Sequence, residues 1–123
     1  MAEMSPAHLA VEMEDLESLR DLLDAGADVH EEYYGLTLLH HAVDAEIDGH
    51  TQTGEPLHVD TTAYLLARGA DPRRRSGGGT GVSAEHMAFV RGHWLATSLF
   101  EEWIRTHADA PAACERADEE AGT

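Results

Sequence analysis

The chain has 123 residues, of which 42% are hydrophobic and 6% aromatic, so one small domain with a mainly aliphatic core is expected. Its 24 acidic residues outnumber the 8 basic ones, all of them arginine, and give a formal net charge of −16. Such a charge repels the phosphates of nucleic acid and favours a protein partner with a basic surface.

Composition also bears on the setting in which the protein acts. The chain contains neither Lys nor Asn, which is typical of a GC-rich genome and indicates a bacterial origin. Cys114 is the only cysteine, which excludes an intrachain disulfide and favours a reducing compartment. No apolar run reaches the roughly 18 residues of a membrane helix, and the N-terminus has no signal segment. We therefore expect a cytoplasmic protein without membrane contact.

One six-residue pattern occurs three times, beginning at Ser5, Thr37 and Ser83. Each of these hydroxyl residues precedes an apolar run and is placed to cap the free N–H groups of a helix, and Pro6 suits a first helical position. Three helix starts are therefore predicted. The pattern places histidines at its fourth position and alanines at its sixth, namely His8, His40, His86, Ala10, Ala42 and Ala88.

A second helix is predicted after each of these starts. Gly26 and Gly69 end the first two of them, because glycine tolerates the left-handed conformation that follows a helix. Recurrence on a period near 33 residues indicates a stack of helix pairs. The residues with helical apolar spacing are Leu16, Leu19, Leu22 and Leu23, then Val59, Ala63, Leu65 and Leu66, then Leu95, Leu99, Phe100 and Trp103.

The three segments resemble the Thr-Pro-Leu-His-x-Ala signature of ankyrin repeats, and the third continues to Gly92-His93, as that family's repeats do. The resemblance spans about residues 5–107. It implies an all-α helical solenoid of three helix-turn-helix repeats joined by short hairpin-like fingers. The predicted domain is residues 1–107, with repeats at about 5–35, 36–78 and 79–107, followed by an acidic, disordered tail at 108–123.

Two features of the signature carry further expectations. The resemblance implies that His8, His40 and His86 are structural, hydrogen-bonding within and between repeats, and their wide spacing does not suit a tetrahedral metal site. The signature's leucine is replaced by Ala7 and Glu85 in the terminal repeats, whose outer faces meet water and can be more polar. Glu85 leaves the register of the third repeat open.

The middle repeat carries an insertion at about residues 46–58, which we expect to form an extended loop. It overlaps a near match to a calcium-loop pattern, with Gly49 at the sharp turn. Alternatives are a chance match, in which the acidic residues continue the first helix on its solvent side, and a transition-metal site built from His41, His50 and His58 with Asp44 or Asp60. The candidate calcium ligands are Asp44, Glu46, Asp48 and Glu55.

The family resemblance implies that a partner docks on the fingers and the first helices, which form a concave face. The predicted fingers are residues 29–35 and 71–81. Of the two tyrosines in the first finger, one is expected to pack against the next hairpin and the other to be exposed. The arginine cluster of the second finger either pairs with the partner or forms an ordinary solvated turn. The candidate partner-binding residues are Tyr33, Tyr34, His41, Asp44, Arg73, Arg74, Arg75 and Arg91, with Glu12 at the edge.

The sequence does not indicate a catalytic site, which would need a nucleophile, a base and an electrophilic group close together. Cys114 lies in the polar tail. We therefore predict a monomeric, non-enzymatic protein-binding module without a cofactor. A narrower version is an inhibitor or immunity-type protein that masks a basic partner. The rival hypotheses are a calcium-responsive protein that uses Asp44 to Glu55, and a repeat fragment with no dedicated partner.

Overall fold

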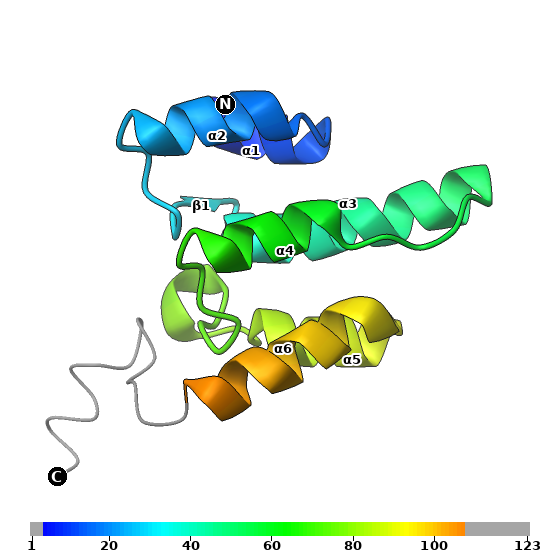
Figure 1. The fold of residues 1–123 in the computed structure, drawn as a ribbon. Coiled ribbons are helices and arrows are strands. Elements are labelled where there is room, and N and C mark those ends of the chain that lie inside the picture. Colours follow the sequence, from blue (N-terminus) through cyan, green and yellow to red (C-terminus); the bar gives the residue numbers. More distant parts are fainter. Residues whose placement is uncertain (1–3, 108–123) are drawn as a thin grey trace, which may run out of the picture.

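The computed structural model describes residues 4–107. Its helices form three antiparallel pairs that stack in layers (Figure 1), with a two-stranded hairpin after the first pair and a short 3₁₀ turn after the second. The predicted tail at 108–123, with Cys114, lies outside the described residues. The elements are α1 Pro6–Glu12, α2 Leu16–Asp24, β1 Glu32–Tyr33, β2 Leu36–Thr37, α3 Leu38–Thr53, α4 Asp60–Ala67, η1 Gly77–Gly79, α5 Ala84–Arg91 and α6 Trp94–Thr106.

The first helix of each pair begins where the hydroxyl residues predict. The side-chain oxygens of Ser5, Thr37 and Ser83 each accept a hydrogen bond from the backbone N–H three residues later, at distances of 3.2, 3.2 and 3.0 Å. Each bond satisfies one of the N–H groups that a helix start leaves free. The three predicted helix starts are confirmed.

Glycine ends the second helices of the first two pairs, also as predicted. Gly26 and Gly69 follow α2 and α4 with φ angles of 108° and 102°, in the region that side chains disfavour. Just beyond them, the N–H of Ala27 donates to Leu22 O, and that of Ala70 donates to Leu65 O, both at 3.0 Å. These bonds satisfy carbonyls that the helix end would otherwise leave without partners.

The turn between the paired helices takes a left-handed residue in the first pair as well as the third. Gly92, between α5 and α6, has a φ of 82°, and Glu14, between α1 and α2, has a φ of 56°. Glycine takes this conformation without a steric penalty, whereas a residue with a Cβ is strained by about 1 kcal/mol. Glu14 therefore stores strain that its counterpart Gly92 does not.

Replacing Glu14 with glycine is expected to stabilise the protein by about 0.5–1 kcal/mol, because it removes this strain. The change also removes an ion pair of 3.4 Å with His58, but that pair is partly exposed and contributes little. Urea unfolding measures the difference. Glu17→Gly, within α2, is the control and should destabilise by about 1 kcal/mol; equal effects of the two changes would contradict the assignment of strain to Glu14.

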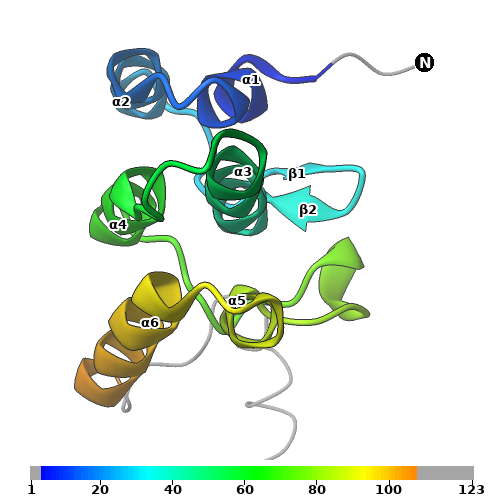
Figure 2. The ribbon, with the colours of Figure 1, turned by 90° about the vertical axis from the view of Figure 1, so that its right-hand side faces the viewer.

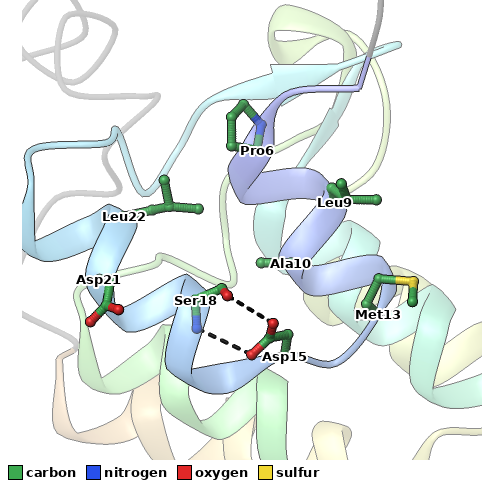
Figure 3. A pocket seen from close by; sticks show the side chains of 8 residues that line it. All are labelled: Pro6, Leu9, Ala10, Met13, Asp15, Ser18, Asp21 and Leu22. Carbon is green, nitrogen blue, oxygen red and sulfur yellow. Dashed lines mark hydrogen bonds between the residues drawn. The ribbon is translucent and has the colours of Figure 1, made fainter.

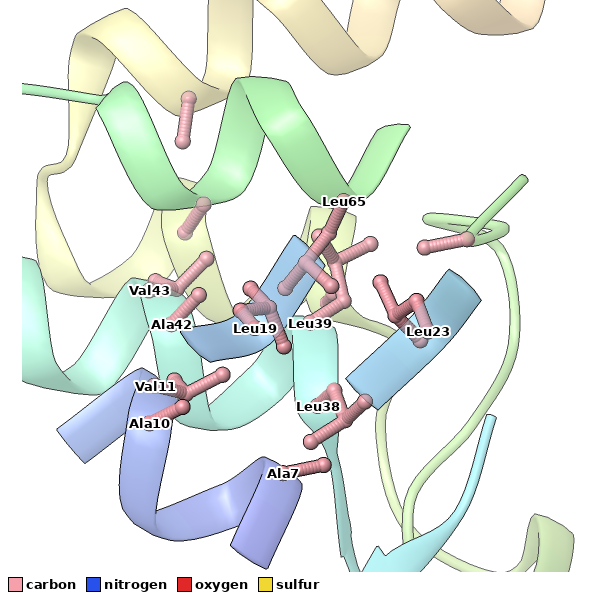
Figure 4. Packing of buried hydrophobic residues seen from close by; sticks show 14 of the residues in the cluster. Ala7, Ala10, Val11, Leu19, Leu23, Leu38, Leu39, Ala42, Val43 and Leu65 are labelled. Carbon is pink, nitrogen blue, oxygen red and sulfur yellow. The ribbon is translucent and has the colours of Figure 1, made fainter. Parts of the chain in front are cut away.

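The core runs through all three layers. Leu19 of α2, Leu39 and Val43 of α3 and Leu65 of α4 meet at its centre (Figure 4), each 2% exposed or less. Full burial of each such side chain contributes about 1.5–3 kcal/mol relative to exposure. Ala10, Ala42 and Ala88 occupy equivalent buried positions on α1, α3 and α5.

The insertion in the middle layer is mostly helix, so the prediction of an extended loop at 46–58 is wrong for its first half. Helix α3 continues to Thr53 and ends at Gly54, which has a φ of 76°. Only residues 54–59 form the non-helical return to α4. As a result α3 extends well beyond its neighbours at one end of the stack (Figure 1). The helix persists because the buried face that contains Ala42 and Val43 continues through Glu46.

Candidate partner-binding surface

The two connections between layers project on the same side of the stack as the first helices. Figure 2 shows α1, α3 and α5 in one column, α2, α4 and α6 in another, and both connections reaching outward past the first column. We call residues 29–37, which contain β1 and β2, the first finger and residues 71–83, which contain η1, the second finger. Together with the first helices they form one continuous side of the molecule.

The first finger presents an exposed tyrosine on a supported turn. Its strands pair Glu32 with Thr37 and Tyr33 with Leu36, and Tyr34 takes a positive φ of 52° at the turn. The Tyr34 side chain is 73% exposed, and its ring meets the edge of Tyr33 at a centroid distance of 4.5 Å. The finger therefore offers a large aromatic surface whose conformation is already restricted.

Tyr33 is the packed member of the pair, but its neighbour differs from the prediction. Its ring lies 5.6 Å from that of His8 on the preceding helix α1, rather than against the next hairpin. The hairpin folds back toward the layer before it, because Glu31 O accepts a hydrogen bond of 3.2 Å from His8 Nε2. The prediction that one tyrosine packs and the other is exposed is confirmed. The predicted packing partner, the next hairpin, is wrong.

The two fingers touch each other. Gly77 N donates to Gly35 O at 2.7 Å, and Gly78 N donates to a carboxylate oxygen of Glu32 at 3.3 Å. A Cβ on Gly35 would lie 3.3 Å from the Gly77 backbone, so glycine permits this approach. These contacts hold the fingers together as one surface instead of two independent loops.

The three arginines that follow one another in the second finger have different surroundings. Arg73 pairs with Asp71 at 3.0 Å and lies 5.2 Å from the Trp103 ring centroid, so it is directed toward α6. Arg74 is half-buried. Arg75 is exposed and donates to Gly81 O at 2.8 Å. Arg75 is therefore the one exposed arginine among these three.

His41 is a second correction, because it is 5% exposed instead of lying open on the concave face. Its Nδ1 lies 2.9 Å from His8 Nδ1, and its Nε2 lies 2.6 Å from a Glu12 carboxylate oxygen. His8 Nε2 must carry a proton, because the Glu31 carbonyl that it faces can only accept. The pKa of His8 is lowered, chiefly by burial, so its Nδ1 accepts from His41. His41 thus links α3 to α1.

Asp44 and Arg91 lie at the predicted face but bind each other. The Arg91 Nη1 is 3.3 Å from an Asp44 carboxylate oxygen, and both side chains are more than one third exposed. The pair connects α3 to α5 across the layer boundary. Surface pairs of this kind contribute about 0–1 kcal/mol, so either residue remains available to a partner at little cost.

The signature histidines behave differently in the three layers. His8 and His40 are fully buried, and His40 Nε2 donates to Val82 O at 2.8 Å, as His8 does to the first finger. His86 is exposed. His93 is fully buried and caps α6 by accepting from Ala96 N at 3.3 Å. The structural role predicted for His86 is therefore limited to its backbone N–H, which donates a hydrogen bond to Ser83 Oγ.

The candidate calcium ligands do not surround one point. Asp44, Glu46 and Asp48 lie on α3, whereas Glu55 follows its end, and Gly49 is helical instead of forming a sharp turn. Glu46 is fully buried and points into the core. Across residues 4–107 no three His, Cys, Asp or Glu side chains converge in a metal-binding arrangement, which also applies to His41, His50 and His58.

Glu46, a candidate ligand in the calcium-loop alternative, instead lies in a buried hydrogen-bond network. Its Oε1 lies 2.7 Å from His93 Nε2 and accepts from Thr62 Oγ1 at 2.8 Å, and its Oε2 accepts from Thr62 N at 3.0 Å. The carboxylate therefore joins α3, α4 and α6. Helical spacing from Leu39 through Ala42 to Glu46 was the signal that could have placed it on the buried face.

Comparison with known families agrees with this arrangement of helix pairs and fingers. A family model described as "Ankyrin repeat" matches residues 3–32, which cover α1, α2 and the start of the first finger. This chain is an ankyrin repeat protein. Its fold is the all-α ankyrin-repeat fold, with one small strand pair in the first finger.

Ankyrin repeats are generally protein–protein interaction modules, and the family is a non-enzymatic one. No curated protein matches this ankyrin repeat protein. None of the helices in residues 4–107 combines the length and the apolar character that crossing a bilayer requires.

Proposed function

We propose that this ankyrin repeat protein is a non-enzymatic module that binds a protein partner through the fingers and the concave face of α1, α3 and α5. The observation that carries the proposal is Tyr34, 73% exposed at the tip of a finger that Tyr33 and the second finger support. Exposed aromatic side chains that are already ordered lose little conformational entropy on binding and are enriched among interface hot spots. The working unit comprises three repeats at about 5–35, 36–78 and 79–107.

The charge of this surface favours a basic partner. Glu31 and Glu32 lie on the first finger and Glu12 at the end of α1, and among the three consecutive finger arginines Arg75 alone is exposed. A net charge of −16 would accelerate encounter with a basic surface, most strongly at low salt. Masking of a basic protein, as by an inhibitor or immunity-type protein, is the narrower form of this proposal.

Two histidine–carboxylate pairs, one of them fully buried, support a binding role over catalysis. His41 with Glu12 joins α3 to α1, and His93 with Glu46 joins α6 to α3. Both pairs hold layers together, and the second is closed off from solvent altogether. Groups that could serve as an acid and a base are thus occupied in packing the stack.

Affinity capture with Tyr34→Ser tests the proposal. We expect recovery of the partner to fall about tenfold or more relative to the unaltered protein, since interface anchors contribute about 2 kcal/mol. Phe89→Ser is the control, because Phe89 is similarly exposed, at 71%, but lies on α5 facing the far end of the stack. Full recovery with Tyr34→Ser, or equal losses with both variants, would refute a finger-centred interface.

The partner's charge is tested on the captured complex. We expect the dissociation constant to rise as NaCl is raised from about 50 to about 300 mM, since salt screens attraction between opposite charges. An acidic partner, or a dissociation constant that does not respond to salt, would reject the basic-partner form of the proposal.

A further inference from the structure

The outer face of the first helix pair carries an open apolar groove, here called the end groove (Figure 3). It lies between α1 and α2 and has a volume of about 430 Å³. Among its apolar side chains, Leu9 is 51% exposed and Met13 is 69% exposed. The residues that line it are Pro6, Leu9, Ala10, Met13, Asp15, Ser18, Asp21 and Leu22.

The same positions are covered by a helix pair in the other two layers. His41 occupies in α3 the place that Leu9 has in α1, and it packs on His8 and Glu12 of the preceding layer. Arg91 occupies in α5 the place of Met13, and it pairs with Asp44 of the preceding layer. The end groove is therefore the first-layer copy of a surface on which helices pack elsewhere in this chain. Its shape suits a helix.

Two carboxylates, those of Asp15 and Asp21, line this groove, and no basic side chain does. The nearby Arg20 has its guanidinium 3.1 Å from Asp21. Asp15 accepts from Ser18 Oγ at 2.7 Å and from Ser18 N at 3.2 Å (Figure 3). These two bonds lower the pKa of Asp15, so its carboxylate stays ionised at neutral pH. The groove therefore combines an apolar floor with two carboxylates.

Charge argues against a second copy of this chain as the occupant. The opposite end of the stack also has a groove, where Phe89 lies between Glu85 and Glu101. Stacking of copies end to end would place the carboxylates of one groove against those of the other, and like charges in contact are unfavourable.

We propose that the end groove binds an amphipathic helix of a partner protein, with apolar side chains on Leu9 and Met13 and Lys or Arg side chains toward Asp15 and Asp21. Helix-in-groove recognition of this kind uses apolar anchors at helical spacing. The end groove is a second docking surface, separate from the fingers. Loss of binding at one surface leaves the other intact, so the two proposals are tested separately.

A synthetic peptide of about 18 residues serves as the probe, with Leu on one helical face and Lys on the other. Fluorescence anisotropy measures its affinity, and ¹⁵N chemical-shift changes locate it on the protein. We expect the shifts to centre on Leu9, Met13 and Leu22. A peptide of the same composition in scrambled order, and one with Glu in place of Lys, should both bind at least tenfold more weakly.

Paired variants separate groove binding from general attraction to an acidic protein. Leu9→Gln with Met13→Gln should raise the dissociation constant about tenfold, while Phe89→Gln with Val90→Gln should leave it unchanged; all four side chains are at least 51% exposed, so folding should survive. Equal binding by both double variants, shifts centred on the fingers or on α5, or equal binding of the acidic peptide would overturn the proposal. So would self-association through the end groove in analytical ultracentrifugation.

Discussion

Replacing Glu46 with alanine is expected to lower the free energy of unfolding by about 3–5 kcal/mol, since each buried donor that loses its acceptor costs about 1–3 kcal/mol. Glu46 and His93 are both 0% exposed. His93 Nδ1 accepts from Ala96 N, so the proton of the neutral ring lies on Nε2, 2.7 Å from Glu46. Thr62 supplies two further donors to the same carboxylate. Alanine would leave all three buried donors without an acceptor.

Urea unfolding of the two proteins measures this loss. Asp48→Ala is the matched control, because Asp48 is an exposed carboxylate on the same helix, and its removal should change stability by about 0.5 kcal/mol or less. Glu46→Gln should fall between the two, since its amide keeps one acceptor oxygen but turns an NH₂ group toward other donors. A loss for Glu46→Ala no larger than that for Asp48→Ala would show that the buried network does not hold the layers.

The features that the sequence predicts correctly are local. Ser5, Thr37 and Ser83 cap helices through an oxygen that reaches a backbone N–H only three residues away, so the signal and the contact lie in the same segment. Gly26 and Gly69 end helices for an equally local reason, since the required φ angle belongs to the residue itself.

The features that the sequence predicts wrongly depend on contacts between layers. His41 is buried because His8 and Glu12 of another helix cover it, and its own segment carries no mark of this. Glu46 forms part of an acidic run that matches a calcium loop, while its helical spacing from Ala42 places it inward. The calcium-loop pattern and the helical pattern thus include the same residue. Only the contacts with Thr62 and His93 show that the helical pattern applies.

In the candidate binding surface, too, local features were predicted correctly and features that depend on contacts between layers were not. Exposure of one finger tyrosine follows from composition and turn position, and Tyr34 confirms it. The orientation of Arg73 does not follow from composition or turn position, because Asp71 and the ring of Trp103 on α6 bind its side chain. The end groove was not predicted either, since its floor of Leu9 and Met13 has the apolar spacing of an ordinary core helix.

Mild acid is expected to destabilise the fold through two buried histidines. Burial is the main cause that lowers the pKa of both His8 and His40 below the ordinary value of 6.5. In each, Nε2 donates to a backbone carbonyl and Nδ1 faces a group that can donate to it, His41 for His8 and Thr37 for His40. The fold therefore holds both rings in the neutral form.

The direction of the pH effect follows from proton counting. When the folded pKa lies below the unfolded value of 6.5, the unfolded chain binds more protons as the pH falls through 6.5. The stabilisation is complete above that pH and is lost on acidification, down to the folded pKa. Between pH 7.5 and 5.5 each histidine can contribute a loss of up to about 1.4 kcal/mol, the equivalent of one pKa unit.

His40→Gln isolates one of these contributions, because glutamine has no proton to gain in this range. Urea unfolding at pH 7.5 and 5.5 should show that this variant loses about 1 kcal/mol less stability on acidification than the unaltered protein. His86→Gln is the control: His86 holds the same place in its repeat but is exposed, so its removal should leave the pH dependence unchanged. If His40→Gln is too unstable at pH 7.5, His8→Gln provides the same comparison. A pH dependence that neither buried variant reduces would mean that other groups, such as the acidic residues, set the acid sensitivity of this fold.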